Sequence, residues 1–157
     1  MTKQHNNDIR GEEMNELKRA LEWHQQAIPN PTNKNKCIAV GVHYEEVSEM
    51  MEAMVDDRDS MEVEYIASLY KTCAESHLHH IETMGEVDRI ALLDALADQI
   101  VTATGVANAF GFDILGALEE VNRSNYSKFE DGKPVFDDNG KITKGKHYTP
   151  PNLKPFI

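Results

Sequence analysis

Residues 86–110 read EVDRIALLDALADQIVTATGVANAF, and this stretch decides the fold class. Its apolar side chains recur at intervals of three and four residues, which is the period of an α-helix, and Gly111 follows as a stop. Strand-like alternation of apolar and polar residues does not occur before residue 130. The sequence therefore predicts an all-α protein in which residues 86–110 form the longest helix.

The same spacing predicts further helices on either side of this stretch. They cover residues 8–28, residues 38–56, a segment from a possible N-cap at Ser60 to about residue 81, and a last segment that Asp113 caps and that runs to Val121. The connections between them are short, and Gly85 breaks the chain before the longest helix. Successive helices joined by short loops predict an antiparallel bundle of four to five helices.

The last 36 residues differ from the helical part in charge and in pattern. Residues 1–121 carry 9 basic and 23 acidic side chains, whereas residues 122–157 carry 7 basic and 4 acidic ones. Two short apolar segments flank the turn dipeptide Asn139-Gly140, which predicts a small β-hairpin. Because two strands cannot bury a core of their own, the hairpin must lean on the helices. We expect one domain over residues 1–157, with a helical body (1–121) and a basic tail (122–157) that packs on it.

Composition excludes several classes of function. The 157 residues carry a net charge of −11, which repels nucleic acid and anionic lipid. No uninterrupted apolar run approaches the roughly 20 residues of a membrane span, and residues 1–10 lack the apolar stretch of a secretory signal. Only Cys37 and Cys73 are present, which predicts two reduced, packed thiols. We expect a cytoplasmic protein without a nucleic acid or membrane partner.

Acidic side chains gather on one face of the helix predicted over residues 38–56. Glu45, Glu49, Glu52 and Asp56 share a narrow stripe, and Glu46 lies at its edge. Like charges three or four residues apart on a helix cost about 0.2–0.5 kcal/mol per pair, so this stripe indicates a ligand that compensates the repulsion. A solvated acidic face without a ligand is the alternative.

Two further acids interrupt the apolar stretch of residues 86–110. Asp94 and Asp98 lie four residues apart among Leu and Ala, where a buried carboxylate needs a proton, a cationic partner or a metal. A Lys or Arg from another segment is one alternative. Together the two clusters supply only oxygen ligands, which suit Mg²⁺ or Mn²⁺. No Glu is followed by His three residues later, which excludes a ferritin-like di-iron site. His77, His79 and His80 are predicted to be surface or capping residues rather than zinc ligands.

The order of these motifs resembles the MazG-like all-α nucleoside triphosphate pyrophosphohydrolases. The family's first motif, EExxE, is matched by Glu45-Glu46-Val47-Ser48-Glu49. Its second motif is an acidic pair ending in Asp on a later helix. Here the pair is Asp94 and Asp98, with Ala95 where the family usually has Glu. The segment Ser124-Asn125-Tyr126-Ser127-Lys128 and the Lys- and Gly-rich tail are also similar, so the resemblance covers nearly the whole chain.

This resemblance implies cleavage of a nucleoside triphosphate between its α- and β-phosphates, with Mg²⁺ or Mn²⁺ as cofactor. On an acidic protein the metal would neutralise the triphosphate and stabilise charge in the transition state. The residues that the resemblance assigns to the metal are Glu46, Glu49, Asp94 and Asp98, and Glu45 is the general base. Asn125, Lys128, Lys141, Lys144 and Tyr148 are assigned to phosphate and sugar contacts. Trp23 is expected to belong to the core.

The methionine-rich stripe of Met50, Met51 and Met54 predicts more exposed apolar area than a monomer tolerates, so we expect a homodimer. The resemblance points to the same oligomeric state. Two other functions remain open at this point. One is a non-catalytic acidic helical protein that binds a basic partner, and the other is the same fold acting on a different phosphoester.

Overall fold

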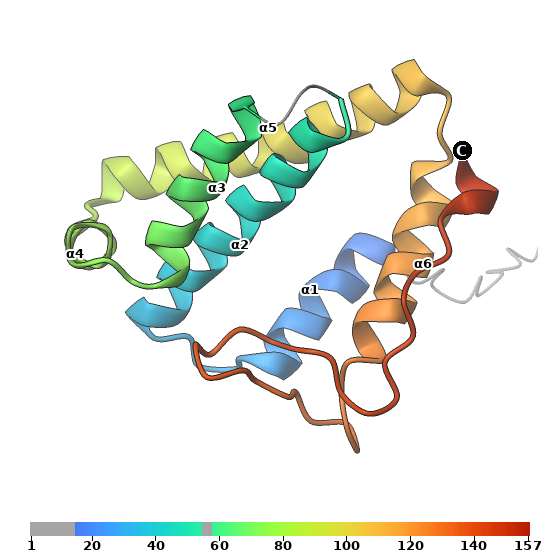
Figure 1. The fold of residues 1–157 in the computed structure, drawn as a ribbon. Helices are drawn as coiled ribbons and strands as arrows, with labels where there is room; N and C mark the ends of the chain where they lie inside the picture. Colours follow the sequence, from blue (N-terminus) through green and yellow to red (C-terminus); the bar gives the residue numbers. More distant parts are fainter. Residues whose placement is uncertain (1–14, 55–57) are drawn as a thin grey trace, which may run out of the picture.

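The computed structural model describes residues 15–54 and 58–157, and over these residues the protein is all-α, as predicted (Figure 1). Six α-helices and one short 3₁₀-helix are present in this part of the chain. They are α1 (Glu16–Ala27), α2 (Asn33–Glu52), α3 (Arg58–Lys71), α4 (Glu75–Thr83), α5 (Glu86–Phe110), α6 (Ile114–Tyr126) and η1 (Lys154–Phe156).

Several helix boundaries agree with the sequence pattern. The α5 helix spans the predicted residues and ends at Gly111, whose φ of 75° an L-residue rarely adopts. The carboxylate of Asp113 accepts a hydrogen bond from the Gly116 amide at 3.0 Å and caps α6, which continues to Tyr126. Asn15 caps α1 and Thr32 caps α2, so α2 begins five residues before the predicted position. The predicted helical residues 8–14 and 55–56 lie outside the described residues.

The prediction of one helix from Ser60 to about residue 81 is wrong, because two helices occupy this segment. They are separated at Thr72–Ala74, where Cys73 has a φ of 52° and the helical hydrogen-bond ladder is broken. Ser60 is not an N-cap. It lies inside α3, is buried, and its carbonyl oxygen accepts a hydrogen bond from the Ser48 hydroxyl at 2.9 Å.

The predicted β-hairpin in the tail is not supported. The described tail contains two isolated antiparallel bridges, Glu130 with Lys133 and Phe136 with Ile142, and no strand. A side chain holds the Asn139-Gly140 turn together, because Asp137 Oδ1 accepts hydrogen bonds from the amides of Asn139 and Lys141, each at 2.9 Å. The turn therefore forms without an extended ladder on either side.

The helices pack in two groups that the tail connects (Figure 1). In one group α2 packs on α3. Their backbones approach so closely that a Cβ at Gly41 would lie 2.6 Å from the backbone nitrogen of Lys71. In the other group α1 packs on α6. Trp23 is buried there, as predicted: its ring stacks on Phe129, and its indole nitrogen donates to the Asn125 carbonyl at 2.9 Å.

Helix α5 packs far less than its composition predicts. Ala107 is its one buried residue, and the expectation that Asp94 and Asp98 lie in a packed interior is wrong for the single chain. By length and composition alone α5 is also long and apolar enough to cross a membrane, so the expectation that no segment reaches that length was too strong. Cys37 is buried and Cys73 is partly buried, and both are free thiols, as predicted.

Candidate functional site

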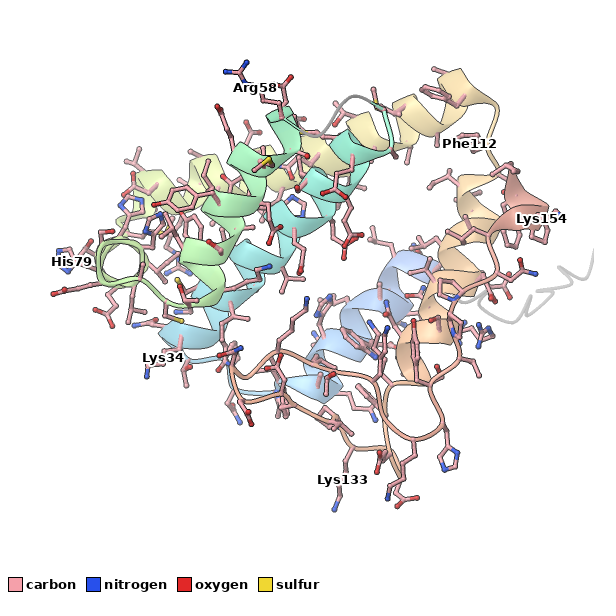
Figure 2. The ribbon with its side chains drawn as sticks, viewed as in Figure 1. Lys34, Arg58, His79, Phe112, Lys133 and Lys154 are labelled. Carbon is pink, nitrogen blue, oxygen red and sulfur yellow. The ribbon has the colours of Figure 1, made fainter. Side chains whose placement is uncertain are left out.

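A pocket of about 500 Å³ lies where the tail crosses from α6 to α2. In Figure 2 the tail passes Lys133 and runs below α1 toward the start of α2, near Lys34. Helix α2 contributes acids to the wall and the tail contributes lysines, while α1 contributes the edge of the aromatic core. The charged and aromatic lining residues are Trp23, His24, Glu46, Glu49, Lys128, Asp137, Lys141 and Lys144.

The first acid of the EExxE motif, Glu45, is not among the residues that line this pocket. Its two carboxylate oxygens accept separate hydrogen bonds, from Lys71 Nζ at 3.0 Å and from Lys141 Nζ at 2.6 Å. Partial burial alone would raise the pKa of Glu45, but the hydrogen bonds from Lys141 and Lys71 outweigh it and the pKa is lowered. Glu45 therefore stays ionised and anchors the tail to α2 and α3.

The other two acids of the motif, Glu46 and Glu49, line the pocket. Within the described residues, neither carboxylate lies within 4 Å of a cationic nitrogen, in contrast to Glu45. Partial burial raises the pKa of Glu46, and the charges of Glu49 and Glu45 raise it further. The charges of Lys128 and Lys141 offset part of this rise in pKa. The repulsion that the sequence predicted on this helix is thus compensated at Glu45 and only partly compensated at Glu46.

Three lysines approach the same pocket from the tail. Lys128 Nζ lies 5.7 Å from the centre of the Trp23 ring, and Lys144 Nζ lies 5.0 Å from the centre of the Tyr148 ring. Partial burial lowers the pKa of Lys128, and the charges of Lys141 and Lys144 contribute in the same direction. An anion bound in the pocket would offset the repulsion among the three lysines.

The remaining predicted phosphate and sugar contacts lie outside the pocket lining. The Asn125 carbonyl is engaged by the Trp23 indole, and Asn125 helps to end α6. Tyr148 supports Lys144 through its ring rather than facing the pocket directly. The structure therefore brings together Lys128, Lys141 and Lys144 of the five residues assigned to substrate.

Asp94 and Asp98 are exposed on α5 and do not line the pocket. Between α5 and α2 the polar contact is a hydrogen bond of the His43 ring with the Gln99 side-chain oxygen. Within residues 15–54 and 58–157, no group of three or more His, Cys, Asp or Glu is arranged to hold a metal ion. The role of Asp94 and Asp98 as metal ligands stays a prediction.

Sequence reasoning missed Lys71 and Asp137. Lys71 lies 26 residues beyond Glu45 and meets it because Gly41 lets α3 approach α2 closely. Asp137 holds the turn that presents Lys141. The spacing of residues along the sequence does not predict the contact between Lys71 and Glu45. An Asp two residues before Asn-Gly is a recognisable turn signal, so the role of Asp137 could have been predicted.

The acids that face the pocket fit a magnesium ion bound together with a substrate. Mg²⁺ in nucleotide sites is commonly held by one or two protein carboxylates, with water and substrate phosphates completing the shell. Glu46 and Glu49 would be those carboxylates, and the repulsion between them is what a dication relieves. The metal would supply charge neutralisation at the phosphates.

Comparisons of the chain with protein-family models, with curated proteins and with solved structures found no match.

Proposed function

We propose that the protein is a Mg²⁺-dependent nucleoside triphosphate pyrophosphohydrolase, which cleaves its substrate between the α- and β-phosphates to a monophosphate and pyrophosphate. One observation supports the proposal: a pocket of about 500 Å³ is lined by Glu46 and Glu49, which form no ion pair within 4 Å among the described residues, and by three lysines of the tail. Carboxylates for a dication and ammonium groups for phosphates are the donor set that a metal–triphosphate complex needs. The resemblance of the EExxE motif and of the tail to MazG-like enzymes supports the same reaction.

In this proposal the lysines bind and orient the triphosphate. The Lys128 ammonium group lies over the Trp23 ring, and both residues line the pocket. Lys141 is held by Glu45, so one lysine is positioned before the substrate arrives. Preorganised cations of this kind reduce the entropy lost when the triphosphate binds.

The contacts favour Glu46 over Glu45 as the general base. A base must reach the attacking water and must be able to accept its proton. Glu45 is engaged by two lysines and its pKa is lowered, whereas Glu46 faces the pocket and its pKa is raised. Glu46 would then take the proton from the water that attacks the phosphorus in place of its predicted role as a metal ligand, and Glu49 would be the carboxylate that holds the metal. The predicted role of Glu45 passes to positioning Lys141.

The test is an assay of pyrophosphate release from each of the common (d)NTPs, with Mg²⁺, with Mn²⁺ and with EDTA. We expect metal-dependent release of stoichiometric pyrophosphate and monophosphate, and a loss of activity in EDTA. Release of inorganic phosphate instead of pyrophosphate would show that the enzyme cleaves between the β- and γ-phosphates rather than between the α- and β-phosphates. No turnover of any triphosphate by protein that is folded by circular dichroism would contradict the proposal.

A further inference from the structure

The two cysteines of the chain lie side by side although they are far apart in the sequence. Cys37 is in the second turn of α2, and Cys73 is in the connection between α3 and α4, which passes the start of α2 (Figure 1). The Cys37 thiol forms a hydrogen bond with the Cys73 side chain. The Cys73 thiol donates to the Lys34 carbonyl oxygen at 3.8 Å, on the helical turn that precedes Cys37. Since helical side chains lean toward the N-terminus, this is the turn that the Cys37 side chain covers. Both contacts place the two sulfur atoms together.

The packing of α2 on α3 fixes the distance between these thiols. Gly41 lies four residues after Cys37, on the same face of α2. A Cβ at Gly41 would lie 2.8 Å from the Ala67 carbonyl oxygen and 2.6 Å from the backbone nitrogen of Lys71, two residues before Cys73. The two backbones are therefore in direct contact beside the cysteines. A bond between groups that are already held together costs little further conformational freedom.

The two thiols differ in their access to solvent. Cys37 is buried with 0% of its surface exposed, whereas Cys73 is partly exposed. Burial raises the pKa of Cys37 to about 11, and the neighbouring Cys73 contributes in the same direction. Since the thiolate is the reactive form and must reach its reagent, Cys73 is the thiol that meets an oxidant. Cys37 is positioned to resolve the product on Cys73.

We propose that Cys37 and Cys73 form a reversible redox pair, which small-molecule disulfides of the glutathione class oxidise to an intramolecular disulfide. The Cys73 thiolate attacks one sulfur of oxidised glutathione, and the first glutathione leaves as a thiolate. Cys37 then loses its proton and attacks the Cys73 sulfur, which releases the second glutathione. The two protein thiols lose two electrons, and oxidised glutathione becomes two molecules of reduced glutathione that carry both protons. The proposal does not depend on the proposed enzymatic activity.

The disulfide would close residues 37–73 into a covalent loop. This loop contains most of α2 and all of α3, including Glu45 and Lys71, which form an ion pair between the two helices. A cross-link of this length restricts the unfolded chain and so stabilises the folded one. It would also fasten the connection at Cys73, where φ is 52°, to the first turns of α2. Oxidation would thus lock the packing of α2 on α3, and reduction would release it.

The experiment treats the wild-type full chain with oxidised glutathione and blocks the remaining thiols with iodoacetamide. Intact mass spectrometry should show a chain that has lost two hydrogen atoms and carries no blocking group. Digestion without reduction should yield one peptide pair linked through Cys37 and Cys73. Tm should rise by about 5 °C or more, because the cross-link stabilises the fold. An excess of reduced glutathione should restore both the thiols and the original Tm.

Two variants test the order of the steps. Cys37→Ala removes the resolving thiol, so the reaction should stop at a mixed disulfide of Cys73 with glutathione. Cys73→Ser is the matched control, and its buried Cys37 should stay unmodified while circular dichroism shows a folded chain. The wild-type measurement stands if either variant fails to fold. Two free thiols in treated wild type, a disulfide between two chains, an unchanged Tm on oxidation, or glutathione on Cys37 of folded Cys73→Ser would each overturn the proposal.

Discussion

Acidic side chains at the pocket and on helix α5 have opposite surroundings. At the pocket, α2 carries three acids in one turn and a half, and segments far along the chain bring lysines to them. On α5, two acids stand in an apolar helix that meets little of the rest of the chain. One region is completed by distant segments of its own chain, and the other packs on little of that chain.

This difference shows that an acidic motif and an acidic site are not the same thing. Glu45 belongs to the motif and serves as a structural anchor, because Lys71 and Lys141 occupy both of its oxygens. Glu46 and Glu49 differ from it by what faces them rather than by their residue type. The chemistry assigned to each acid therefore depends on partners that lie far away in the sequence.

The largest expected effect is at the pocket. Glu49→Gln removes a carboxylate that is proposed to hold Mg²⁺, and we expect turnover to fall about 100-fold or more, because several kcal/mol of charge stabilisation is lost. Pyrophosphate release measured at saturating substrate gives the turnover. Glu52→Gln, one turn further along α2 and outside the pocket lining, is the matched control and should stay within about twofold of the wild type. Equal losses of turnover in both variants would show that an acid that lines the pocket contributes no more than an acid elsewhere on the same face of α2.

The second prediction tests whether Asp98 on α5 takes part in the site on α2. The family resemblance assigns Asp98 to the metal, and we expect Asp98→Asn to lower turnover at least about tenfold and to weaken the thermal stabilisation by Mg²⁺. Since Asp98 is outside the pocket, such a loss would mean that α5 moves toward the site when substrate or a second copy binds. Glu86→Gln, in the first turn of the same helix, is the control. Wild-type turnover in Asp98→Asn would confine the metal site to α2.

The third prediction separates binding from chemistry at the tail. Lys128→Ala should raise KM for the triphosphate about tenfold and leave kcat within about twofold, because a charge-assisted hydrogen bond contributes about 1.5–3 kcal/mol. Lys146→Ala is the control, since the Lys146 side chain is 80% exposed and does not line the pocket. A loss in kcat with KM unchanged would place Lys128 at the transition state instead.

The smallest effect concerns the opposite pKa shifts of two adjacent acids. The pKa of Glu45 is lowered, so its contribution to stability is present above the ordinary carboxyl pKa of about 4.3 and disappears as the pH falls through its lowered value. At pH 7, Glu45→Gln should cost about 1 kcal/mol, or roughly 2–4 °C in Tm, and at pH 3 the cost should shrink.

Glu46→Gln should do the reverse. The pKa of Glu46 is raised, so its ionised form weakens the fold above that raised value, and the variant should be more stable than the wild type at pH 7. Solvent screening limits the gain to under about 1 kcal/mol, and the gain should vanish below pH 4. Thermal melts of Glu45→Gln and Glu46→Gln between pH 3 and pH 7 test both predictions. If Tm changes with pH in the same way in the two variants, the two carboxylates do not have the different surroundings described above.

Much of the fold could be predicted from local pattern. The boundaries of α5, the Asp113 cap of α6 and the burial of Trp23 all follow from periodicity, capping and side-chain type. The break at Cys73 could not be predicted, because apolar spacing continues through residues 72–74 although the helix does not. The periodicity of apolar residues shows which face of a helix is apolar. It does not show where a single residue leaves the helical backbone conformation and ends the helix.

Sequence pattern predicted an all-α chain with an acidic body and a basic tail. Of the ten site residues that the family resemblance implied, Glu46, Glu49, Lys128, Lys141 and Lys144 line one pocket. The packing of distant segments, which the sequence pattern does not reveal, pairs Lys71 with Glu45 and leaves Asp94 and Asp98 outside the pocket lining. The reason is the separation along the chain over which each interaction acts. Helix propensity and capping act over a few residues, whereas an ion pair or a pocket wall is set by which distant segments pack together.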